Sequence, residues 1–168
     1  MEITRTKIMD HATIALKLER IAYQVYENNF DEKEIILVSI AGNGEEVAKR
    51  LQKILKNICQ IQISVAKISM DKKNPHSDKS SIDIDLGYLA DKSIVLIDDV
   101  LNSGITLMYA ARFILQVRLK QLITVVLVDR RHRKYPIRAD YVGITLSTTI
   151  QEHITVEFSD TNSAIYLE

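Results

Sequence analysis

Three short apolar runs constrain the fold of this chain more than any other feature of its sequence. They are EIILVSI (34–40), SIVLI (93–97) and LITVVLV (122–128), and segments with helical periodicity separate them. Each run is apolar at nearly every position instead of at every second position, which is typical of strands buried on both faces. Strands that alternate with helices form parallel sheets through right-handed crossovers. The pattern therefore predicts an α/β fold with a central, mainly parallel sheet flanked by helices.

The segments between and beyond these runs supply the remaining elements. Apolar residues at helical spacing predict helices at about 11–28, 47–58 and 106–119, with Asp10 as the N-cap of the first. Further strands are expected at 59–70, 140–146, 153–158 and near the C-terminus. The segment DKKNPHSDKSSID (71–83) is polar, contains a proline and shows no periodicity. Long loops of this kind in compact domains are often lids or binding loops.

Composition limits the class of protein. The 168 residues are 46% hydrophobic and 26% charged, which suffices for one domain with a substantial core. The formal net charge of zero provides no overall attraction to nucleic acid or to an acidic membrane. Cys59 is the single cysteine, so no disulfide can form within the chain. Because the sequence also shows no signal peptide and no run of about 18 apolar residues, we expect a soluble, cytoplasmic protein.

Ligands of open α/β sheets bind beyond the carboxyl ends of the strands, so four segments are candidates for a site. They are residues 41–44, 70–86, 98–106 and 129–133. The third lies within IVLIDDVLNSGITL (94–107) and begins with two acids, Asp98 and Asp99. Ionised carboxylates only accept hydrogen bonds, so they repel a phosphate but suit sugar hydroxyls or a divalent metal.

The small polar turn that follows the acids, residues 102–106, suits a phosphate. It precedes a predicted helix, whose unpaired amides and dipole favour an anion. Gly104 lets the backbone approach closely, and Ser103 and Thr106 add hydroxyl donors. A phosphate site beside a site for hydroxyls or metal predicts that the ligand is a phosphorylated sugar.

Three other interpretations of this stretch compete with a phosphorylated-sugar site. A plain strand end, turn and helix N-cap would have the same outline, although the acid pair and the Ser-Gly-x-Thr turn occurring together disfavour it. A Walker-type phosphate loop needs the pattern GxxxxGK[ST], which the sequence lacks. A phospho-acceptor receiver domain carries paired acids on its first strand, whereas two predicted strands precede the acids here.

The stretch IVLIDDVLNSGIT resembles the phosphoribosyl-pyrophosphate (PRPP) motif of type I phosphoribosyltransferases. VVLVDRRHRKYPIRADYVG (125–143) is similar to one branch, the bifunctional pyrimidine-operon attenuator and uracil phosphoribosyltransferase family of the PyrR type, which typically reads LVDRGHRELPIRADYVGK. Residues 8–29 and 37–51 align with this branch without gaps, so the resemblance covers nearly the whole chain. It implies a type I phosphoribosyltransferase fold as a single domain over 1–168, with a small hood, a flexible loop at about 71–86 and a homodimeric or larger assembly.

The resemblance also implies an activity and a set of site residues. The family transfers a phosphoribosyl group from PRPP to a nitrogenous base and releases pyrophosphate, with Mg²⁺. Asp98 and Asp99 would be the catalytic acids, holding the ribose 2′- and 3′-hydroxyls directly or through metal-bound water, while Mg²⁺ itself comes with the substrate. The other implied groups are a 5′-phosphate turn of Asn102, Ser103, Gly104, Ile105 and Thr106, a pyrophosphate loop of Ala41, Gly42, Asn43 and Gly44, and a base pocket that includes Asp129, Arg130, Val142 and Ile150.

The pyrophosphate loop departs from the family pattern. Relatives often carry basic residues there, in a form like GIKTRG, whereas this chain reads SIAGNG with Ala41 and Asn43 at the basic positions. A charge-assisted hydrogen bond contributes roughly 1.5–3 kcal/mol, so we expect weaker binding of pyrophosphate, with the backbone amides from Gly42 to Gly44 still able to form an anion nest. Three lysines of the 71–86 loop are candidates to reach pyrophosphate or else are solvated surface residues: Lys72, Lys73 and Lys79.

The base pocket departs from the pattern as well. Asn102 takes the place of an aspartate that exchanges a proton with the base in purine-using relatives, which argues against a purine. The branch often continues GKNVPTSR where this chain reads GITLSTTI, so Ile144 replaces a lysine and Ile150 an arginine. The pocket is therefore expected to be more apolar than in the branch.

An RNA-binding regulator is a rival hypothesis from another class. Its support is a basic cluster suited to phosphates, made by Arg130, Arg131, His132, Arg133, Lys134 and Arg138. The attenuator pattern has threonine and histidine where this chain has Glu19 and Tyr23, and Glu19 repels a phosphate backbone. A solvated or subunit-facing turn would look the same. The leading hypothesis is therefore a PRPP- and Mg²⁺-dependent transferase for a pyrimidine such as uracil, and the alternative is a nucleotide- or RNA-binding relative with weak or no turnover.

Overall fold

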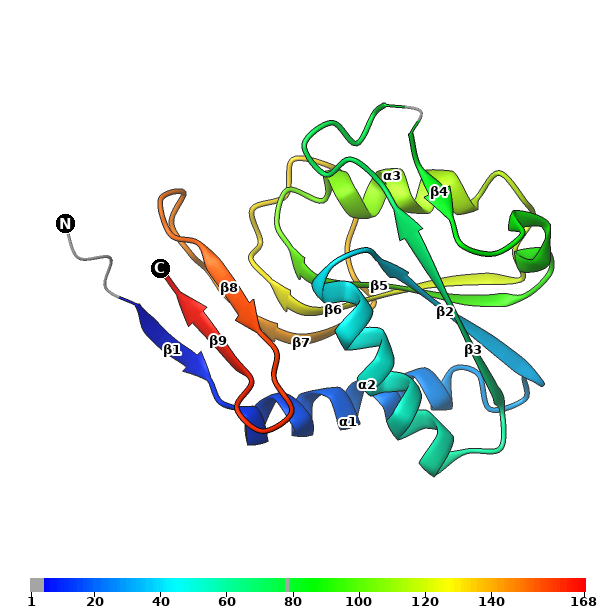
Figure 1. Cartoon of the computed structure of the whole chain (residues 1–168), viewed down its shortest axis with the longest axis horizontal. Helices are drawn as coiled ribbons and strands as arrows, with labels where there is room; N and C mark the ends of the chain where they lie inside the picture. Colours follow the sequence, from blue (N-terminus) through cyan, green and yellow to red (C-terminus); the bar gives the residue numbers. More distant parts are fainter. Residues whose placement is uncertain (1–4, 78) are drawn as a thin grey trace.

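The structure, a computed structural model, describes residues 5–77 and 79–168 and contains two β-sheets (Figure 1). The large sheet has the strand order β4–β3–β2–β5–β6–β7. Its strands are β2 (Glu34–Ile40), β3 (Gln62–Ser69), β4 (Ser81–Ile82), β5 (Ser93–Leu101), β6 (Gln121–Asp129) and β7 (Tyr141–Thr145). Neighbouring strands run parallel except β4, which pairs antiparallel with β3. The α/β fold with a mainly parallel sheet is thereby confirmed.

A small antiparallel sheet and the helices surround the large sheet. The small sheet has the order β1–β9–β8 and consists of β1 (Thr6–Met9), β9 (Ala164–Leu167) and β8 (Ile154–Glu157). The helices are α1 (His11–Glu27), α2 (Asn43–Ile58) and α3 (Ile105–Ile114), with a 3₁₀ turn η1 (Leu86–Leu89). In Figure 1, α1 and α2 lie on one face of the large sheet and α3 on the other. Within the described residues, no helix has both the length and the apolar character to cross a membrane.

The central strands are buried on both faces because alternate residues point toward different helices. In β2, Ile35 and Leu37 belong to the core cluster formed with α1 and α2. Ile36 and Val38 belong to the cluster formed with α3. This two-sided burial explains why the strand reads as an unbroken apolar run, as parallel strands between two helix layers do.

Strand β5 extends further than its apolar run. It continues through both acids to Leu101, and it keeps pairing with β6 through the partners Val100–Val128 and Leu101–Asp129. The acid pair therefore lies inside the strand and not after it, which corrects the expected strand end at residue 97. The strand extends to Leu101 because β6 continues beside it, and the local sequence of β5 does not reveal this pairing.

Helix α3 is shorter than its apolar periodicity predicts. It ends at Ile114 instead of near residue 119. The Asp91 amide donates to the Arg118 carbonyl at 2.8 Å, so the chain after α3 pairs with the segment that leads into β5. This backbone pairing replaces the last expected turn of helix and directs the chain into β6.

Other short elements also depart from the expectation. Strands β1 and β4 and the turn η1 were not predicted, and β4 interrupts the expected irregular stretch 71–83, of which residue 78 lies outside the described residues. Helix α2 begins at Asn43, within the expected turn 41–44. Strands β1 and β4 are defined by their hydrogen bonds to β9 and β3. They contain too few residues to show a periodicity in the sequence.

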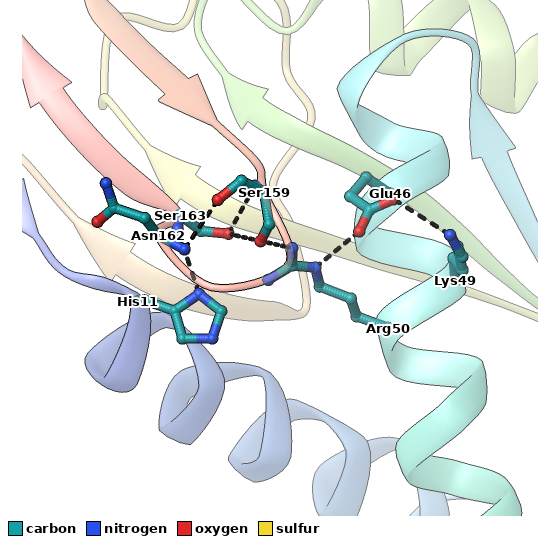
Figure 2. A network of polar contacts seen from close by, with 7 residues as sticks. All are labelled: His11, Glu46, Lys49, Arg50, Ser159, Asn162 and Ser163. Atoms are coloured by element: carbon teal, nitrogen blue, oxygen red, sulfur yellow. Dashed lines mark hydrogen bonds and ion pairs between the residues drawn. The ribbon is translucent and has the colours of Figure 1, made fainter.

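A polar network fastens the small sheet to α1 and α2 (Figure 2). Arg50 of α2 donates to the Ser159 carbonyl at 2.8 Å and to the Glu46 carboxylate at 2.9 Å. The Ser163 amide donates to the Nδ1 atom of His11, at the start of α1, at 3.2 Å. The turn between β8 and β9 is thus held by both helices, which fixes the small sheet beside the start of α2.

Candidate functional site

The carboxyl ends of β2, β5 and β6 meet at one edge of the large sheet, and the predicted site segments gather there. The Arg130 amide, just after β6, donates to the Leu101 carbonyl at the end of β5 at 3.0 Å. At the start of α2, a Cβ atom on Gly44 would lie 3.4 Å from the Asp98 side chain. The structure therefore brings residues 41–44 and 129–133 against the acid pair and its turn.

The turn 102–106, the expected site of the 5′-phosphate, is built around a left-handed glycine. Gly104 is the N-cap of α3 and has a φ of 86°, a conformation that favours glycine. The Ser103 hydroxyl accepts a hydrogen bond from the Ile105 amide at 3.3 Å. Asp98, Asn102, Ser103, Gly104 and Thr106 are among the residues that line a hollow of about 50 Å³ at this helix start. The remaining lining residues are apolar, namely Val100, Leu101, Leu107 and Val126. The amides and hydroxyls of the turn stand at a helix N-terminus, a position that suits a phosphate group.

The segment 134–137, which the sequence linked to the family resemblance and the basic cluster but not to this turn, covers it. The Lys134 and Tyr135 amides donate to the Ser103 carbonyl at 2.8 and 3.1 Å. A Cβ atom on Gly104 would lie 2.8 Å from the Cγ2 atom of Ile137. The loop after β6 therefore fixes the shape of the turn, a role that no local motif in 134–137 indicates.

Gly104→Ala is expected to lower the free energy of unfolding by about 2 kcal/mol, because it adds both a strained φ and a collision with Ile137. Urea denaturation measures the loss. In an Ile137→Ala background the collision disappears and only the backbone strain remains, so the loss caused by Gly104→Ala is expected to shrink. An equal loss in both backgrounds would contradict the contact with Ile137.

The acid pair combines a buried and a more accessible carboxyl group. Asp98 is 5% exposed and Asp99 is half-buried. The Asp98 carboxylate accepts a hydrogen bond from the Asp99 amide at 3.0 Å. Burial, followed by the charge of Asp99, raises the pKa of Asp98 to about 8, while the Lys72 ammonium group at 3.9 Å acts in the opposite direction. Ligand hydroxyl donors or a cation beside this pair would favour the charged form of Asp98.

The donor set of the pair fits Mg²⁺ that arrives with a phosphorylated ligand. Carboxylate oxygens are hard ligands, and Mg²⁺ is usually held by one or two carboxylates together with substrate phosphates. In the part of the chain that the structure describes, no group of three His, Cys, Asp or Glu side chains is arranged to hold a metal. If Mg²⁺ arrives with a phosphorylated ligand, Asp98 and Asp99 are the residues whose oxygens would hold it.

The loop 41–44, where the resemblance places the pyrophosphate, makes contacts with other parts of the chain. Gly42 has a φ of 106°, and its amide donates to the Glu45 carboxylate at 3.2 Å. The Ala41 amide donates to the Ile68 carbonyl at 2.9 Å. The Asn43 side chain donates to the Val156 carbonyl of β8 at 2.9 Å, so it ties the loop to the small sheet. These contacts fix the loop and occupy the Gly42 amide of the expected anion nest.

The residues of the expected base pocket differ in burial, from the buried Asp129 and Arg130 to the exposed Ile150. Asp129 and Arg130 are buried, and the Arg130 guanidinium donates to the Thr148 hydroxyl at 3.1 Å and to the Glu152 carbonyl. Val142 packs against the core cluster of α3, and Ile150 is 90% exposed. Arg130 therefore positions the segment 148–152.

The basic cluster is smaller than its sequence suggests. Arg130 is buried in the contacts just described, and Arg133 pairs with Asp129 at 2.8 Å. Arg131, Arg133 and Arg138 line an open hollow of about 300 Å³. Of the exposed members of the cluster, Arg131 and Arg138 border this hollow, whereas Lys134 does not.

Comparison with known proteins identifies the family. A family model described as a phosphoribosyl transferase domain matches residues 4–161. The Bifunctional protein PyrR of Streptococcus gordonii is 35% identical over 162 residues, which cover 93% of this chain and 92% of the relative. The pyrimidine operon regulatory protein of Lactococcus lactis subsp. lactis is 34% identical in an alignment of 173 positions, gaps included, that covers 99% of this chain and 98% of the relative.

Solved structures share the fold at lower identity. The hypoxanthine phosphoribosyltransferase of Trypanosoma cruzi matches with a TM-score of 0.79 and 16% identity over 95% of each chain. A hypoxanthine-guanine phosphoribosyltransferase from Bacillus anthracis matches with a TM-score of 0.72 and 20% identity, covering 87% of this chain and 84% of that one. These matches confirm the type I phosphoribosyltransferase fold that the resemblance implied. Together with the family match over residues 4–161, they lead to the conclusion that this chain belongs to the phosphoribosyltransferase family.

Proposed function

We propose that this chain transfers the phosphoribosyl group of PRPP to a pyrimidine base such as uracil and releases pyrophosphate. The observation that carries the proposal is the acid pair of β5, of which Asp98 lines the hollow at the left-handed turn before α3. Asp98 and Asp99 bind the ribose hydroxyls, and residues 102–106 bind the 5′-phosphate. The protein acts as a homodimer or a larger assembly.

The residues of the site act mainly by positioning. The acids fix the ribose, while the amides of the turn fix its phosphate, so the reacting carbon is held for the incoming base. Asp98 and Asp99 would hold Mg²⁺ brought by the substrate, and the ion would supply positive charge for the departing pyrophosphate. Asp129 and Arg130 support the wall of the base site, since Arg130 holds the segment 148–152.

Calorimetry with Mg-PRPP and with UMP tests this function. The wild-type protein is expected to bind both ligands at or below about 1 mM, a modest affinity of about −4 kcal/mol. Asp99→Asn combined with Thr106→Ala removes one contact to the ribose and one to the phosphate, so both affinities are expected to fall by at least about tenfold. Failure of the wild type to bind either ligand would refute the proposal.

A pyrophosphate-release assay over uracil, hypoxanthine, guanine, adenine and orotate identifies the base. Turnover is expected with uracil. Binding of PRPP or UMP without release on any base would select a nucleotide-sensing relative instead.

An RNA-binding regulator is the second candidate, favoured by the hollow that Arg131, Arg133 and Arg138 line. Guanidinium groups gathered at one surface site bind phosphates through charge-assisted hydrogen bonds. An electrophoretic shift with a steep dependence on salt would support this candidate, and the absence of a shift at low salt would reject it.

A further inference from the structure

We propose that the hollow between α2 and the start of α1 is a second anion site, which binds small molecules that carry two or more adjacent phosphate groups. The hollow has a volume of about 490 Å³. Its lining residues belong to α1, α2 and the turn between β8 and β9, so it is separate from the acid pair and the turn 102–106. This second site is therefore independent of the proposed function.

A row of lysines on α2 forms one wall of the hollow. This lysine strip consists of Lys49, Lys53 and Lys56. Spacings of four and three residues place the three side chains on one face of the helix. Because a helix rises about 1.5 Å per residue, the strip extends over about 10 Å. A single phosphate group contacts only part of this length, whereas a chain of phosphates reaches more of it.

The charge of the lysine strip is poorly compensated by the chain itself. Glu46 lies 4.0 Å from Lys49, but it also accepts a hydrogen bond from Arg50 at 2.9 Å. The neighbours of Lys53 on the helix face are cations, namely Lys49, Arg50 and Lys56, and like charges at this spacing destabilise a helix. Four cations and two carboxylates line the hollow, so an anion that enters it meets a net charge of +2.

His11 adds a hydrogen-bond donor from α1. Its Nδ1 atom accepts a hydrogen bond from the Ser163 amide at 3.2 Å (Figure 2). A ring nitrogen that accepts a hydrogen bond carries no proton, so the proton of the neutral ring is on Nε2. Among the described residues Nε2 has no hydrogen-bond partner, and His11 lines the hollow. An N–H donor of fixed tautomer beside ammonium groups suits phosphate oxygens.

The turn between β8 and β9 closes one end of the hollow. Arg50 donates to the Ser159 carbonyl at 2.8 Å, and its guanidinium group lies 4.8 Å from the centre of the Phe158 ring. Arg50 is thus engaged in holding the turn, which leaves the lysine strip and His11 to bind a ligand. Asp160 lines the hollow from the same turn and is exposed, so solvent screens its opposing charge.

The size and the lining of the hollow favour a small phosphorylated molecule over RNA. Its volume lies within the range of about 300–1,000 Å³ that is usual for small-molecule sites. Sites for single-stranded nucleic acid combine cations with aromatic side chains on which bases stack. None of the residues that line this hollow is Phe, Tyr or Trp. The ligand is therefore held through its phosphates.

Calorimetry with inorganic triphosphate, without Mg²⁺ and at low salt, tests the second site. The background is the variant Asp99→Asn combined with Thr106→Ala, which impairs the proposed PRPP site, and triphosphate is expected to bind to it. Adding Lys53→Ala and Lys56→Ala is expected to weaken this binding by at least about tenfold. Lys33→Ala, an exposed lysine just before β2, is the control and is expected to change the affinity by less than about twofold.

Two further variants test the other walls of the hollow. His11→Asn keeps an acceptor for the Ser163 amide but removes the Nε2 donor, so it is expected to weaken triphosphate by about threefold to tenfold. Asp160→Asn removes the opposing carboxylate, so it is expected to strengthen triphosphate by up to about fivefold.

Thermal unfolding provides an independent readout. Triphosphate at about ten times its Kd is expected to raise the Tm of the background variant by about 3–6 °C. With Lys53→Ala and Lys56→Ala added, the Tm without ligand is expected to be equal or higher, since the repulsion within the strip is reduced. The rise with triphosphate is expected to disappear, which separates lost binding from lost folding.

Two further probes distinguish the sources of the phosphates. Equal affinities for ATP and inorganic triphosphate would support recognition of the phosphate chain alone, and a higher affinity for ATP would support a nucleotide as the ligand. Binding of a single-stranded RNA without binding of triphosphate would overturn the proposal. An unchanged affinity after Lys53→Ala and Lys56→Ala, an equal loss in Lys33→Ala or no binding at low salt would also overturn it, while PRPP and UMP binding by the wild type decides the proposed function separately.

Discussion

Asp98→Asn is expected to make the protein more stable at pH 8 and, at the same time, to weaken PRPP binding by about a hundredfold. The Asp98 carboxyl group is buried in β5 beside a second acid, so its charged form is unfavourable in the folded chain. Asparagine has nearly the same shape and no charge. The variant therefore removes a source of instability together with an acceptor for the ribose hydroxyls, whose loss accounts for up to about 3 kcal/mol of binding.

The gain in stability depends on pH in a defined direction. Burial and the charge of Asp99 raise the pKa of Asp98 to about 8, whereas an aspartate in an unfolded chain titrates near about 4. Between these values the folded protein keeps a proton that the unfolded chain has released, so the wild-type free energy of unfolding falls as the pH rises. The amide of the variant does not titrate and has no such dependence. The advantage of the variant is therefore expected to be small below about pH 4, to reach on the order of 5 kcal/mol near pH 8 and to level off above it.

Urea denaturation at about pH 5 and about pH 8 measures this difference, and calorimetry with Mg-PRPP measures the loss of binding. Asp160→Asn removes an exposed carboxyl group and serves as the charge-matched control. A stability difference for Asp98→Asn that does not grow between the two pH values would show that the burial of Asp98 does not affect its ionisation. Such a stability gain with a loss of function is typical of residues kept for a site at the expense of the fold.

The central sheet was predictable because its signal is local. The runs at 34–40, 93–97 and 122–128 carry apolar residues toward both faces of the sheet, and they form β2, β5 and β6. Elements that depend on distant partners were not predictable in the same way. Strand β1 is defined by its pairing with β9, at the other end of the chain, and the end of α3 is defined by pairing with the segment before β5.

The same distinction applies to the candidate site. The acids and the turn at 98–106 are adjacent in sequence, so the sequence alone could predict that they lie together. Two other features depend on how the loops after β6 and β7 fold against the site. Residues 134–137 cover the turn, and Arg130 holds the segment 148–152. The sequence also left Lys72, Lys73 and Lys79 equivalent, and only the geometry at Gly42 and Asp98 distinguishes Lys72.

Gly143→Ala is expected to lower the free energy of unfolding by at least about 3 kcal/mol, the opposite of what strand propensity alone predicts. In a strand, alanine is ordinarily favoured over glycine by about 0.5–1 kcal/mol. In β7, however, a Cβ atom on Gly143 would collide with the carbonyl oxygen of Leu127 and would lie 2.9 Å from the Cδ1 atom of the same residue. Because one of these atoms belongs to the backbone of β6, the two strands must separate to admit a methyl group.

Separation of β6 and β7 would also displace the expected base-binding part of the site. The Gly143 carbonyl accepts a hydrogen bond from Arg20 of α1 at 3.1 Å, and β7 leads directly into the segment 148–152 that Arg130 holds. Displacement of β7 is therefore expected to increase amide exchange in β7 and to lower the affinity for UMP along with the stability. Thr145→Ala, at an exposed position of the same strand, is the control and is expected to change stability by less than about 0.5 kcal/mol.

A second background separates the backbone collision from the side-chain collision. Leu127→Ala removes the Cδ1 atom but keeps the carbonyl oxygen in the path of the new methyl group. Gly143→Ala is therefore expected to remain destabilising by at least about 2 kcal/mol in that background, as measured by urea denaturation. Full relief of the loss by Leu127→Ala would mean that the side chain alone excludes a Cβ atom, and that β6 and β7 tolerate alanine at this position.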